Sequence, residues 1–460
     1  MMIFDDLIDS EDIALISEDS TQYSYADVIR IASKMVSDIQ ARSLVFLMCN
    51  NTAETVLAYI GLLRKKIVIV LLDPEIKLTQ YEALIQLYKP NYTISSKPLE
   101  FCDLFRNDHN FYIYSNFSNY KHKLHNDLAM MLTTSGTTGS SKYVRLSYDN
   151  IYHNTKDIVA YLGVSSRDTT ITTLPMQYTY GLSIINTHLF KRARIVFFNA
   201  SVISKDFREL LQQYQVTSFG GVPYMYELLS KQKFLDKSVP SLRYITQAGD
   251  KLSKGIKEKI LDSCAKNGID FITMYGLTEA TARVSYLPWE YARKKIGSIG
   301  VAIPNGAIEL VDKSDMIITN SYVSGEIVYT GENVMMGYAD SLEDLEKGDV
   351  MKGKLYTGDI AYCDEDGFYF MVGRKKRIVK LFGNRVNLDE IEKILHQNDF
   401  FCVCTEGENS INIFTTEKGN EDRIKTCLHD TANINMKNIN VHYINEIPKN
   451  ASGKIAYRLL

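Results

Sequence analysis

The sequence predicts an α/β fold that is followed by a small β-rich region and a compact α+β domain. Before about residue 300, apolar strands are continuous rather than alternating, and helical segments separate them. This pattern is typical of a parallel sheet covered on both faces. From about Gly306 the strands become short and are punctuated by Gly, Asp and Asn, and the last 85 residues mix a helix with short strands. A chain of 460 residues has room for two or three such units.

The N-terminal elements follow from hydrophobic periodicity. Apolar side chains recur at helical spacing from Tyr25 to Ile39, and an apolar strand follows at residues 43–48. A second helix is predicted over residues 53–63. A buried strand over 67–72 ends at the stop signal of Asp73 and Pro74. Together these elements predict β-α-β units.

The later elements are predicted in the same way. Strands are expected at 169–173, 194–198, 243–247 and 269–273, with helices at 206–214 and 253–266. The β-rich subdomain, at about 306–372, is expected to hold strands at 307–311, 326–329, 356–362 and 368–372. A C-terminal helix is expected at 388–395.

Composition and charge exclude several classes of protein. With 45% hydrophobic and 23% charged residues, the chain is neither disordered nor fibrous. Its 52 Lys and Arg nearly balance 55 Asp and Glu, so there is no electrostatic footprint for nucleic acid. The longest apolar run, residues 67–72, is too short to cross a bilayer, and the N-terminal stretch is acidic. Seven scattered cysteines argue against a disulfide framework. We therefore expect a soluble, cytoplasmic protein.

The sharpest local signal is the loop LTTSGTTGSSK at residues 132–142. Its glycines admit positive φ, so successive backbone N–H groups can converge on phosphate oxygens. Its hydroxyls add donors, and Lys142 neutralises charge. The spacing is not that of a Walker A loop. A flexible Gly/Ser/Thr connector is the alternative interpretation.

A second polar segment, MYGLTE at residues 274–279, directly follows the predicted strand at 269–273. Polar groups at that position lie at the carboxyl edge of a parallel sheet, where ligands bind in open α/β folds. A carboxylate beside phosphate is repulsive unless a divalent cation lies between them, so Glu279 suggests Mg²⁺. Taken alone, the hexapeptide is also compatible with an ordinary strand–turn.

Three further segments carry polar residues that suit a nucleotide. Asp359, in YTGD, follows a strand and can accept hydrogen bonds from both hydroxyls of a ribose. The basic stretch at 373–385 and the turn at 448–454, which holds Lys454, complete the set. For the basic residues the alternative is a solvated surface.

In this order the segments resemble the adenylate-forming superfamily, which includes acyl-CoA synthetases, aryl-CoA ligases, luciferases and adenylation domains. The matching motifs are SGTTGxxK at 135–142, YGxTE at 275–279, TGD at 357–359, the hinge segment at 373–385 and GK at 453–454. Residues 174–182 and 331–338 look most like those of acyl-CoA synthetases. The sequence departs from the usual phosphate loop at Ser141 and Tyr143, where a proline and a glycine are common.

The resemblance implies a large N-terminal domain of two mostly parallel sheets with helices, residues 1–375, and a small mobile α+β lid, residues 376–460. The lid would rotate about Lys376. The implied reaction is ATP-dependent activation of a carboxylic acid to acyl-AMP with release of pyrophosphate. Transfer to the thiol of CoA or phosphopantetheine then gives a thioester. ATP and Mg²⁺ are the implied cosubstrate and cofactor of such an acid–thiol ligase.

The resemblance also assigns roles to residues. Lys142, Thr278, Glu279 and Lys454 would be catalytic, with Glu279 as the Mg²⁺ ligand and Lys454 bridging the substrate carboxylate and the α-phosphate. Gly383 and Arg385 would line the path of the pantetheine arm. The nucleotide would be bound by Thr133, Thr134, Ser135, Gly136, Thr137, Thr138, Gly139, Ala248, Gly249, Asp250, Met274, Tyr275, Gly276, Asp359 and Arg374.

The identity of the acid and of the thiol stays open. An acidic carrier protein is as compatible with the sequence as free CoA, and a non-catalytic nucleotide-binding protein is a further alternative. Amino-acid-activating relatives place an aspartate shortly after the Leu-Pro segment, and residues 178–181 offer none, so we expect an acid without a free α-amine. Candidate residues of the acyl pocket, with core packing as the alternative, are Tyr178, Tyr180, Ile184, Gly221 and Tyr224.

Overall fold

A computed structural model describes the chain except for residues 1, 2, 6, 8, 101–103, 109–110, 134–142, 237–238, 382–383, 408–409, 433 and 450–454. By internal contacts the chain divides into two compact units. The first comprises residues 1–296, 302–307 and 330–355, and the second comprises 297–301, 308–329 and 356–460. The boundary near residue 375 that the resemblance implies stays a prediction.

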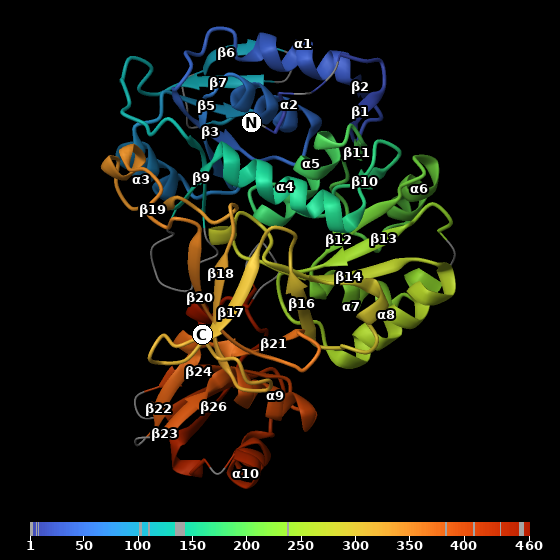
Figure 1. Cartoon of the computed structure of the whole chain (residues 1–460), viewed down its shortest axis with the longest axis vertical. Coiled ribbons are helices and arrows are strands. Elements are labelled where there is room, and N and C mark those ends of the chain that lie inside the picture. Colours follow the sequence, from blue (N-terminus) through green and yellow to red (C-terminus); the bar gives the residue numbers. More distant parts are fainter. Residues whose placement is uncertain are drawn as a thin grey trace. The chain divides into compact units, whose positions relative to one another are not determined.

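The first unit contains two sheets (Figure 1). One has a parallel run in the order β14-β13-β12-β10-β11-β1, with β15 antiparallel to β14 and β2 antiparallel to β1. Its strands are β1 (Ile13–Ile16), β2 (Gln22–Ser24), β10 (Thr169–Ile171), β11 (Arg194–Val196), β12 (Ser218–Gly221), β13 (Tyr244–Gln247), β14 (Asp270–Tyr275) and β15 (Ser285–Leu287).

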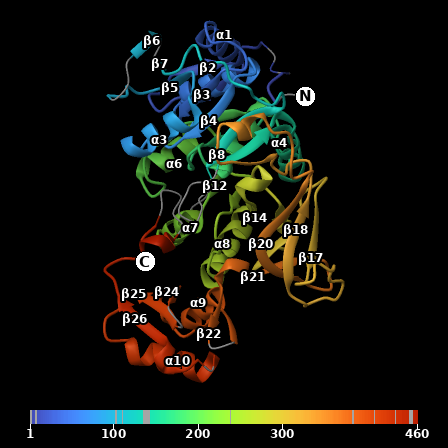
Figure 2. The same ribbon diagram turned by 90° about the vertical axis from the view of Figure 1, so that its left-hand side faces the viewer.

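The second sheet of this unit has the order β19-β9-β8-β4-β3-β5-β7-β6, and Figure 2 shows β3, β4, β5 and β7 side by side. The pairs among β8, β4, β3 and β5 are parallel. The outer pairs are antiparallel. The strands are β3 (Leu44–Met48), β4 (Val68–Leu72), β5 (Tyr92–Ser95), β6 (Leu104–Asp108), β7 (Phe111–Ser115), β8 (Leu128–Thr133), β9 (Tyr143–Ser147) and β19 (Gly337–Ala339).

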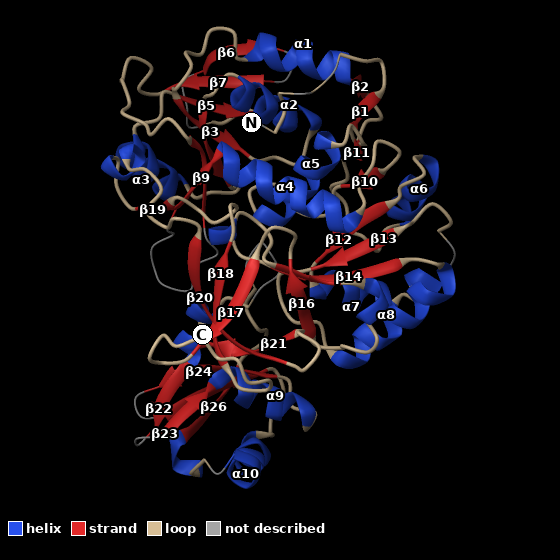
Figure 3. Cartoon of the chain, in the orientation of Figure 1, coloured by secondary structure: helices blue, strands red, loops and turns tan. Residues whose placement is uncertain are grey.

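Helices cover both sheets. In Figure 3, α7 and α8 lie along one side of β12–β14, while α4 packs on Tyr244 and Met274 from the other side. Helix α2 is buried on nearly every face, and its side chains share one core cluster with β3, β4 and β11, so it packs between the two sheets. The helices are α1 (Tyr25–Met35), α2 (Ala53–Arg64), α3 (Leu78–Tyr88), α4 (Tyr148–Leu162), α5 (Thr179–Phe190), α6 (Lys205–Gln213), α7 (Pro223–Lys231) and α8 (Lys254–Asn267), with short 3₁₀ turns η1 (Phe234–Asp236), η2 (Thr278–Ala280), η3 (Trp289–Tyr291) and η4 (Glu343–Glu346).

Local sequence explains where two of these helices begin. The Ser24 side chain accepts a hydrogen bond from the Asp27 backbone N–H, and the Asp27 side chain accepts one from the Ser24 backbone, which is a capping box at the start of α1. Ser147 and Asn150 form the same reciprocal pair at the start of α4. Each box satisfies backbone donors that the first turn of a helix leaves without partners.

The second unit contains a β-rich part and an α+β part. The β-rich sheet has the order β17-β18-β20-β21-β16. In the α+β part, α9 and α10 enclose an apolar core with the β24-β25-β26 sheet. The elements are β16 (Ser298–Ala302), β17 (Ala307–Val311), β18 (Gly325–Thr330), β20 (Lys354–Cys363), β21 (Tyr369–Arg374), η5 (Lys375–Arg377), β22 (Ile378–Leu381), β23 (Asn384–Asn387), α9 (Leu388–Gln397), β24 (Cys402–Gly407), β25 (Ser410–Thr415), α10 (Glu421–Ala432), η6 (Met436–Asn438), β26 (Ile439–Tyr443) and η7 (Tyr457–Leu459).

The predicted fold class is confirmed, and so are the strands and helices expected from the sequence, including β3, α2, β4 and α9. The expected first helix ends earlier, at Met35 instead of near Ile39. Among the residues that the structure describes, no helix is long and apolar enough to span a membrane.

Candidate active site

The turn between β14 and β15 carries Thr278 and Glu279 at the carboxyl edge of the first sheet. The turn closes tightly, since a Cβ atom at Gly276 would lie 1.8 Å from the backbone oxygen of Ala282, so only glycine fits there. The Asn333 side-chain amide donates to the backbone oxygens of Ala280 and Arg283, at 2.9 and 2.8 Å. The turn is thus held from the segment 331–338 that the sequence analysis singled out.

The Glu279 side chain is half-buried, and one of its oxygens accepts a 2.8 Å hydrogen bond from the Tyr338 hydroxyl. Burial and the neighbouring Glu279 carboxylate raise the pKa of Tyr338, so the phenol keeps its proton and acts as the donor. No group of three or more His, Cys, Asp or Glu side chains that could hold a metal occurs in the described parts of the chain. Because Mg²⁺ uses one or two protein carboxylates together with phosphate oxygens and water, a single fixed carboxylate fits such an ion.

The phosphate-type loop begins and ends beside this carboxylate. Thr133 and Tyr143 are paired across β8 and β9, so the loop between them connects two adjacent antiparallel strands. On the other side of β9, Val144 pairs with Tyr338 of β19, the residue that donates to Glu279. Residues 134–142 lie outside the described part, and with them the predicted site residues Thr134, Ser135, Gly136, Thr137, Thr138, Gly139 and Lys142.

The buried Arg145 holds β9 to β19. Its guanidinium donates to four backbone oxygens, those of Tyr338, Met336, Lys347 and Gly348. The strand β9 at the base of the loop is therefore held to β19, whose Tyr338 donates to Glu279 in the β14–β15 turn, although Arg145 and the backbone that it binds are about 200 positions apart in the sequence.

The segment after β13 lies at the same edge as the β14 turn. In the parallel register Gly221, Gln247 and Thr273 are aligned, so the residues that follow them emerge together. The Gln247 side-chain amide donates to the backbone oxygen of Asp250 at 2.8 Å, and Gly249 adopts a φ of 100°. The predicted nucleotide residues Ala248, Gly249, Asp250, Met274, Tyr275 and Gly276 are thereby clustered at this edge.

In the second unit, Asp359 and Arg374 face each other on β20 and β21. Their ion pair has an N–O distance of 3.2 Å, and the Asp359 side chain is buried while that of Arg374 is mostly exposed. The Asp359 backbone N–H donates to the Thr357 hydroxyl, and this hydroxyl donates to the backbone oxygen of Ile327. The TGD turn is thus a defined structure and not a loose loop.

The other predicted residues of the second unit are less fully described. Lys376 lies in η5 and Arg385 in β23, and of these two residues the structure describes the backbone only. Gly383 and Lys454 lie outside the described residues.

A small cavity lies beside α5 in the first unit. Its volume is about 20 Å³, room for about one water molecule. Tyr180 and Ile184 line it, whereas Tyr178, Gly221 and Tyr224 do not, and Tyr224 is exposed. The Tyr180 hydroxyl donates to the backbone oxygen of Thr246 at 2.8 Å and accepts from the Gly221 N–H at 3.2 Å.

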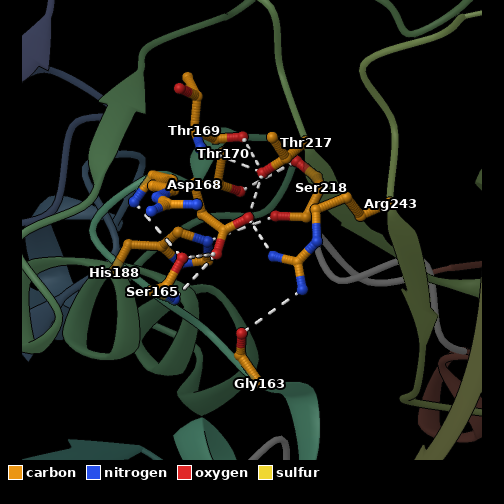
Figure 4. Close-up of polar contacts among 10 residues, drawn as sticks. Gly163, Ser165, Asp168, Thr169, Thr170, His188, Thr217, Ser218 and Arg243 are labelled. Atoms are coloured by element: carbon orange, nitrogen blue, oxygen red, sulfur yellow. Dashed lines mark hydrogen bonds and ion pairs between the residues drawn. The ribbon is translucent and has the colours of Figure 1, made fainter.

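Sequence reasoning missed most of the residues that line this cavity, among them the buried Arg283 and His188. His188 belongs to the polar network of Figure 4, together with Asp168, Ser218 and Arg243. Its Nδ1 lies 2.8 Å from the backbone oxygen of Ile184. A carbonyl only accepts, so Nδ1 carries the proton and Nε2 accepts from Ser218. Burial lowers the pKa of His188 to about 4, so its ring is neutral.

This arrangement defines a nucleotide-binding class of α/β protein: the strands that flank a Gly- and hydroxyl-rich segment of the sequence are linked through Tyr338 to a fixed carboxylate at the carboxyl edge of a mostly parallel sheet. The chain belongs to the AMP-binding enzyme family, which it matches over residues 9–339. It is 29% identical over 344 residues to a probable 4-coumarate–CoA ligase 1 of Dictyostelium discoideum, covering 72% of this chain and 62% of that protein. It is 30% identical over 268 residues to a 2-succinylbenzoate–CoA ligase of Bacillus cereus, covering 58% and 53%. The matches thus span 62% and 53% of the length of these two curated relatives.

Solved structures confirm the fold over nearly the whole chain. The O-succinylbenzoate coenzyme A synthetase of Bacillus subtilis in complex with AMP superposes with a TM-score of 0.79 at 20% identity, covering 98% of this chain and 95% of that one. ATP-bound MatB of Rhodopseudomonas palustris gives a TM-score of 0.79 at 21% identity, covering 99% and 96%.

Proposed function

We propose that this protein activates a small carboxylic acid with ATP and transfers the acyl group to the thiol of CoA. The observation that carries the proposal is the link between the base of the 134–142 loop and Glu279 through β9, β19 and Tyr338. If the loop between these strands cradles phosphate and Glu279 holds a cation, one triphosphate would meet both. Family membership and the names of the curated relatives, which are CoA ligases, support the same activity.

In the first step an oxygen of the substrate carboxylate attacks the α-phosphorus of ATP, and the bond to the β-phosphate oxygen breaks, releasing pyrophosphate. Two anions must approach each other, so positioning and charge compensation are the main needs of catalysis. Lys142 and the backbone N–H groups of the loop would hold the β- and γ-phosphates, and Thr278 the α-phosphate. Glu279 would hold a Mg²⁺ ion, which would supply positive charge to the phosphates.

The remaining predicted residues would orient the nucleotide and complete the reaction. Tyr275 would stack on the adenine, and Asp359 would accept hydrogen bonds from the ribose hydroxyls beside Arg374. Lys454 would stabilise the charge that develops as the carboxylate attacks. In the second step the thiol sulfur attacks the acyl carbon and AMP leaves, with Gly383 and Arg385 along the pantetheine path and Lys376 as the hinge.

We also propose that the protein acts in the cytoplasm, because its cysteines are odd in number and scattered along the chain.

The test is a pyrophosphate-release screen of the purified protein with ATP, Mg²⁺ and fatty, aryl and hydroxy acids, each with and without CoA. We expect release that depends on the acid, and an acyl-CoA product when CoA is present. Acid-dependent release with no acyl-CoA would point to a carrier-protein thiol as acceptor. No acid-dependent release with any acid would contradict the proposal and favour a non-catalytic nucleotide-binding protein.

A further inference from the structure

Arg283 is a buried cation at the wall of the small cavity beside α5. Its side chain is 3% exposed. The guanidinium stacks on the Tyr180 ring at 4.3 Å from the ring centroid. Its hydrogen bonds go to the backbone oxygen of Ala282 at 2.9 Å, the Met274 sulfur at 3.4 Å and the Ser183 hydroxyl at 3.4 Å. The Tyr161 hydroxyl is a further contact.

These contacts do not compensate the charge. No carboxylate forms an ion pair with Arg283 within the described parts of the chain, and the Asp168 carboxylate near His188 is already paired with Arg243 (Figure 4). Arg145, the other fully buried arginine of this unit, donates to four backbone oxygens. Arg283 donates to one backbone oxygen, that of Ala282. Its other two acceptors, the Met274 sulfur and the Ser183 hydroxyl at 3.4 Å, are weak. Burial of a cation without an anionic partner is costly.

The rest of the cavity wall also lacks an anion and offers further donors. Tyr244, only 4% exposed, lines the cavity, and its hydroxyl has the Ser218 hydroxyl as a polar neighbour but makes no hydrogen bond of normal length. A buried hydroxyl held this weakly keeps hydrogen-bonding capacity for a ligand group or an ordered water. His188 is neutral, and the other polar lining residues are the hydroxyl residues Thr170, Ser183, Thr187, Ser218 and Thr246.

We propose that this cavity binds the distal carboxylate of a short dicarboxylic acid, with Arg283 as the residue that selects it. The inference rests on the proposed function, because it places the far end of the activated acid in this cavity. The position of the cavity suits the far end of the acid. Arg283 lies four residues after Glu279 in the same turn, and Gly220, Thr246 and Met274 of β12–β14 line the cavity close to the carboxyl edge.

Size and chemistry narrow the substrate class further. A space of about 20 Å³ holds about one water molecule. A carboxylate is compact enough to take the place of that water, whereas an aromatic ring is too large. The guanidinium fork can donate two parallel hydrogen bonds to a carboxylate, and the Tyr244 hydroxyl in the same wall can add a third. The site therefore favours diacids over monoacids of equal chain length.

The experiment compares matched acid pairs, butyrate with succinate, valerate with glutarate and hexanoate with adipate, and traps the acyl-AMP with hydroxylamine so that no thiol is needed. For at least one pair we expect kcat/KM of the diacid to exceed that of the monoacid by about 100-fold, because a site built around a polar group rejects the analogue that lacks it. Arg283→Met should lose most of that preference, mainly through KM of the diacid. The exposed Arg293, paired with Asp262, provides the matched control Arg293→Met, which should keep the preference.

Two further measurements keep the inference testable if Arg283→Met folds poorly or turnover is absent. Tyr244→Phe removes only the phenol hydroxyl, and should raise the diacid KM severalfold without lowering the unfolding midpoint. Calorimetric titration of the acids without ATP should show diacid binding that Arg283→Met abolishes.

Each outcome has one meaning. Equal use of both members of every pair, or an unchanged diacid preference in Arg283→Met, would overturn the inference and leave the proposed function intact. Diacid binding that depends on Arg283, without any acyl-AMP, would support the inference and contradict the proposed function. Absence of both would contradict both.

Discussion

At the scale of single residues, the proposed activity depends most on the Glu279 carboxylate, which accepts a 2.8 Å hydrogen bond from Tyr338. We predict that Glu279→Gln lowers acid-dependent ATP–pyrophosphate exchange by about 30- to 1000-fold, because loss of one charge-stabilising group costs about 2–4 kcal/mol. The dependence of the rate on Mg²⁺ concentration should shift as well. Tyr338→Phe is the control: it removes the donor but leaves the carboxylate, so its loss should be about tenfold. Exchange by Glu279→Gln within about twofold of wild type would remove Glu279 from the site.

His188 gives a prediction about stability and pH. Burial lowers its pKa from 6.5 to about 4. Above pH 6.5 the ring is neutral in both the folded and the unfolded chain. Between pH 6.5 and 4 the unfolded chain binds a proton that the folded chain does not, so the free energy of unfolding should decrease by up to about 3 kcal/mol as the pH falls. His188→Gln should lose this part of the pH dependence.

The measurement is the urea midpoint of wild type and variant at several pH values from 7 to 4. Glu392, whose pKa burial raises to about 7 in spite of Arg377, has the opposite sign: its stabilisation is lost as the pH rises from 4.5 through 7. Glu392 is present in both the wild type and His188→Gln, so its contribution cancels when the two urea midpoints are subtracted. Midpoint curves that run parallel over this range would show that His188 is not buried in its neutral form.

At the scale of elements, the tight turn between β14 and β15 positions Thr278 and Glu279. A methyl group at Gly276 would overlap the backbone oxygen of Ala282 at 1.8 Å, so the turn must open to accept Gly276→Ala. We predict a stability loss of about 1–3 kcal/mol and a loss of pyrophosphate exchange of at least about 100-fold, since small displacements at the chemistry are expensive. Thermal unfolding and exchange measured on the same preparation separate the two effects.

The matched control for that variant lies in α8. A Cβ atom at Gly255 meets no atom within 4 Å, so Gly255→Ala should leave exchange unchanged and raise stability by about 0.5–1 kcal/mol. Full exchange activity in Gly276→Ala would mean that the turn does not position the reacting groups.

Sequence and structure agree where an element carries its own signal. The buried strands β3 and β4 are unbroken apolar runs, and α2 between them begins at the Thr52 cap, so their bounds could be predicted closely. The bounds of helix α5 could not be predicted from the sequence. This helix is buried on most sides, so it lacks the polar face that would reveal a helical period. The pairing of Tyr338 with Val144, and the burial of Arg283, depend on contacts far apart in the chain. No local pattern predicts them.

At the scale of the whole molecule, the resemblance predicts that Lys454 acts only in the first half of the reaction. Lys454→Ala should fail to form acyl-AMP from acid and ATP, with a barrier increase of about 3–4 kcal/mol, but should transfer the acyl group of supplied acyl-AMP to CoA at nearly the wild-type rate. Separate assays of the two half-reactions check this. Equal loss of both in a folded variant would contradict a lid that uses Lys454 in one orientation only.

The central claim is that a carboxylate oxygen of the substrate attacks the α-phosphorus of ATP. The direct measurement uses an acid labelled with ¹⁸O in its carboxylate, incubated with ATP, Mg²⁺, CoA and the protein, followed by mass spectrometry of the AMP. Because the thiol displaces AMP at the acyl carbon, we predict that each AMP carries one ¹⁸O atom and appears in equal amount to the thioester. Unlabelled AMP, or no AMP that depends on the acid, would contradict it.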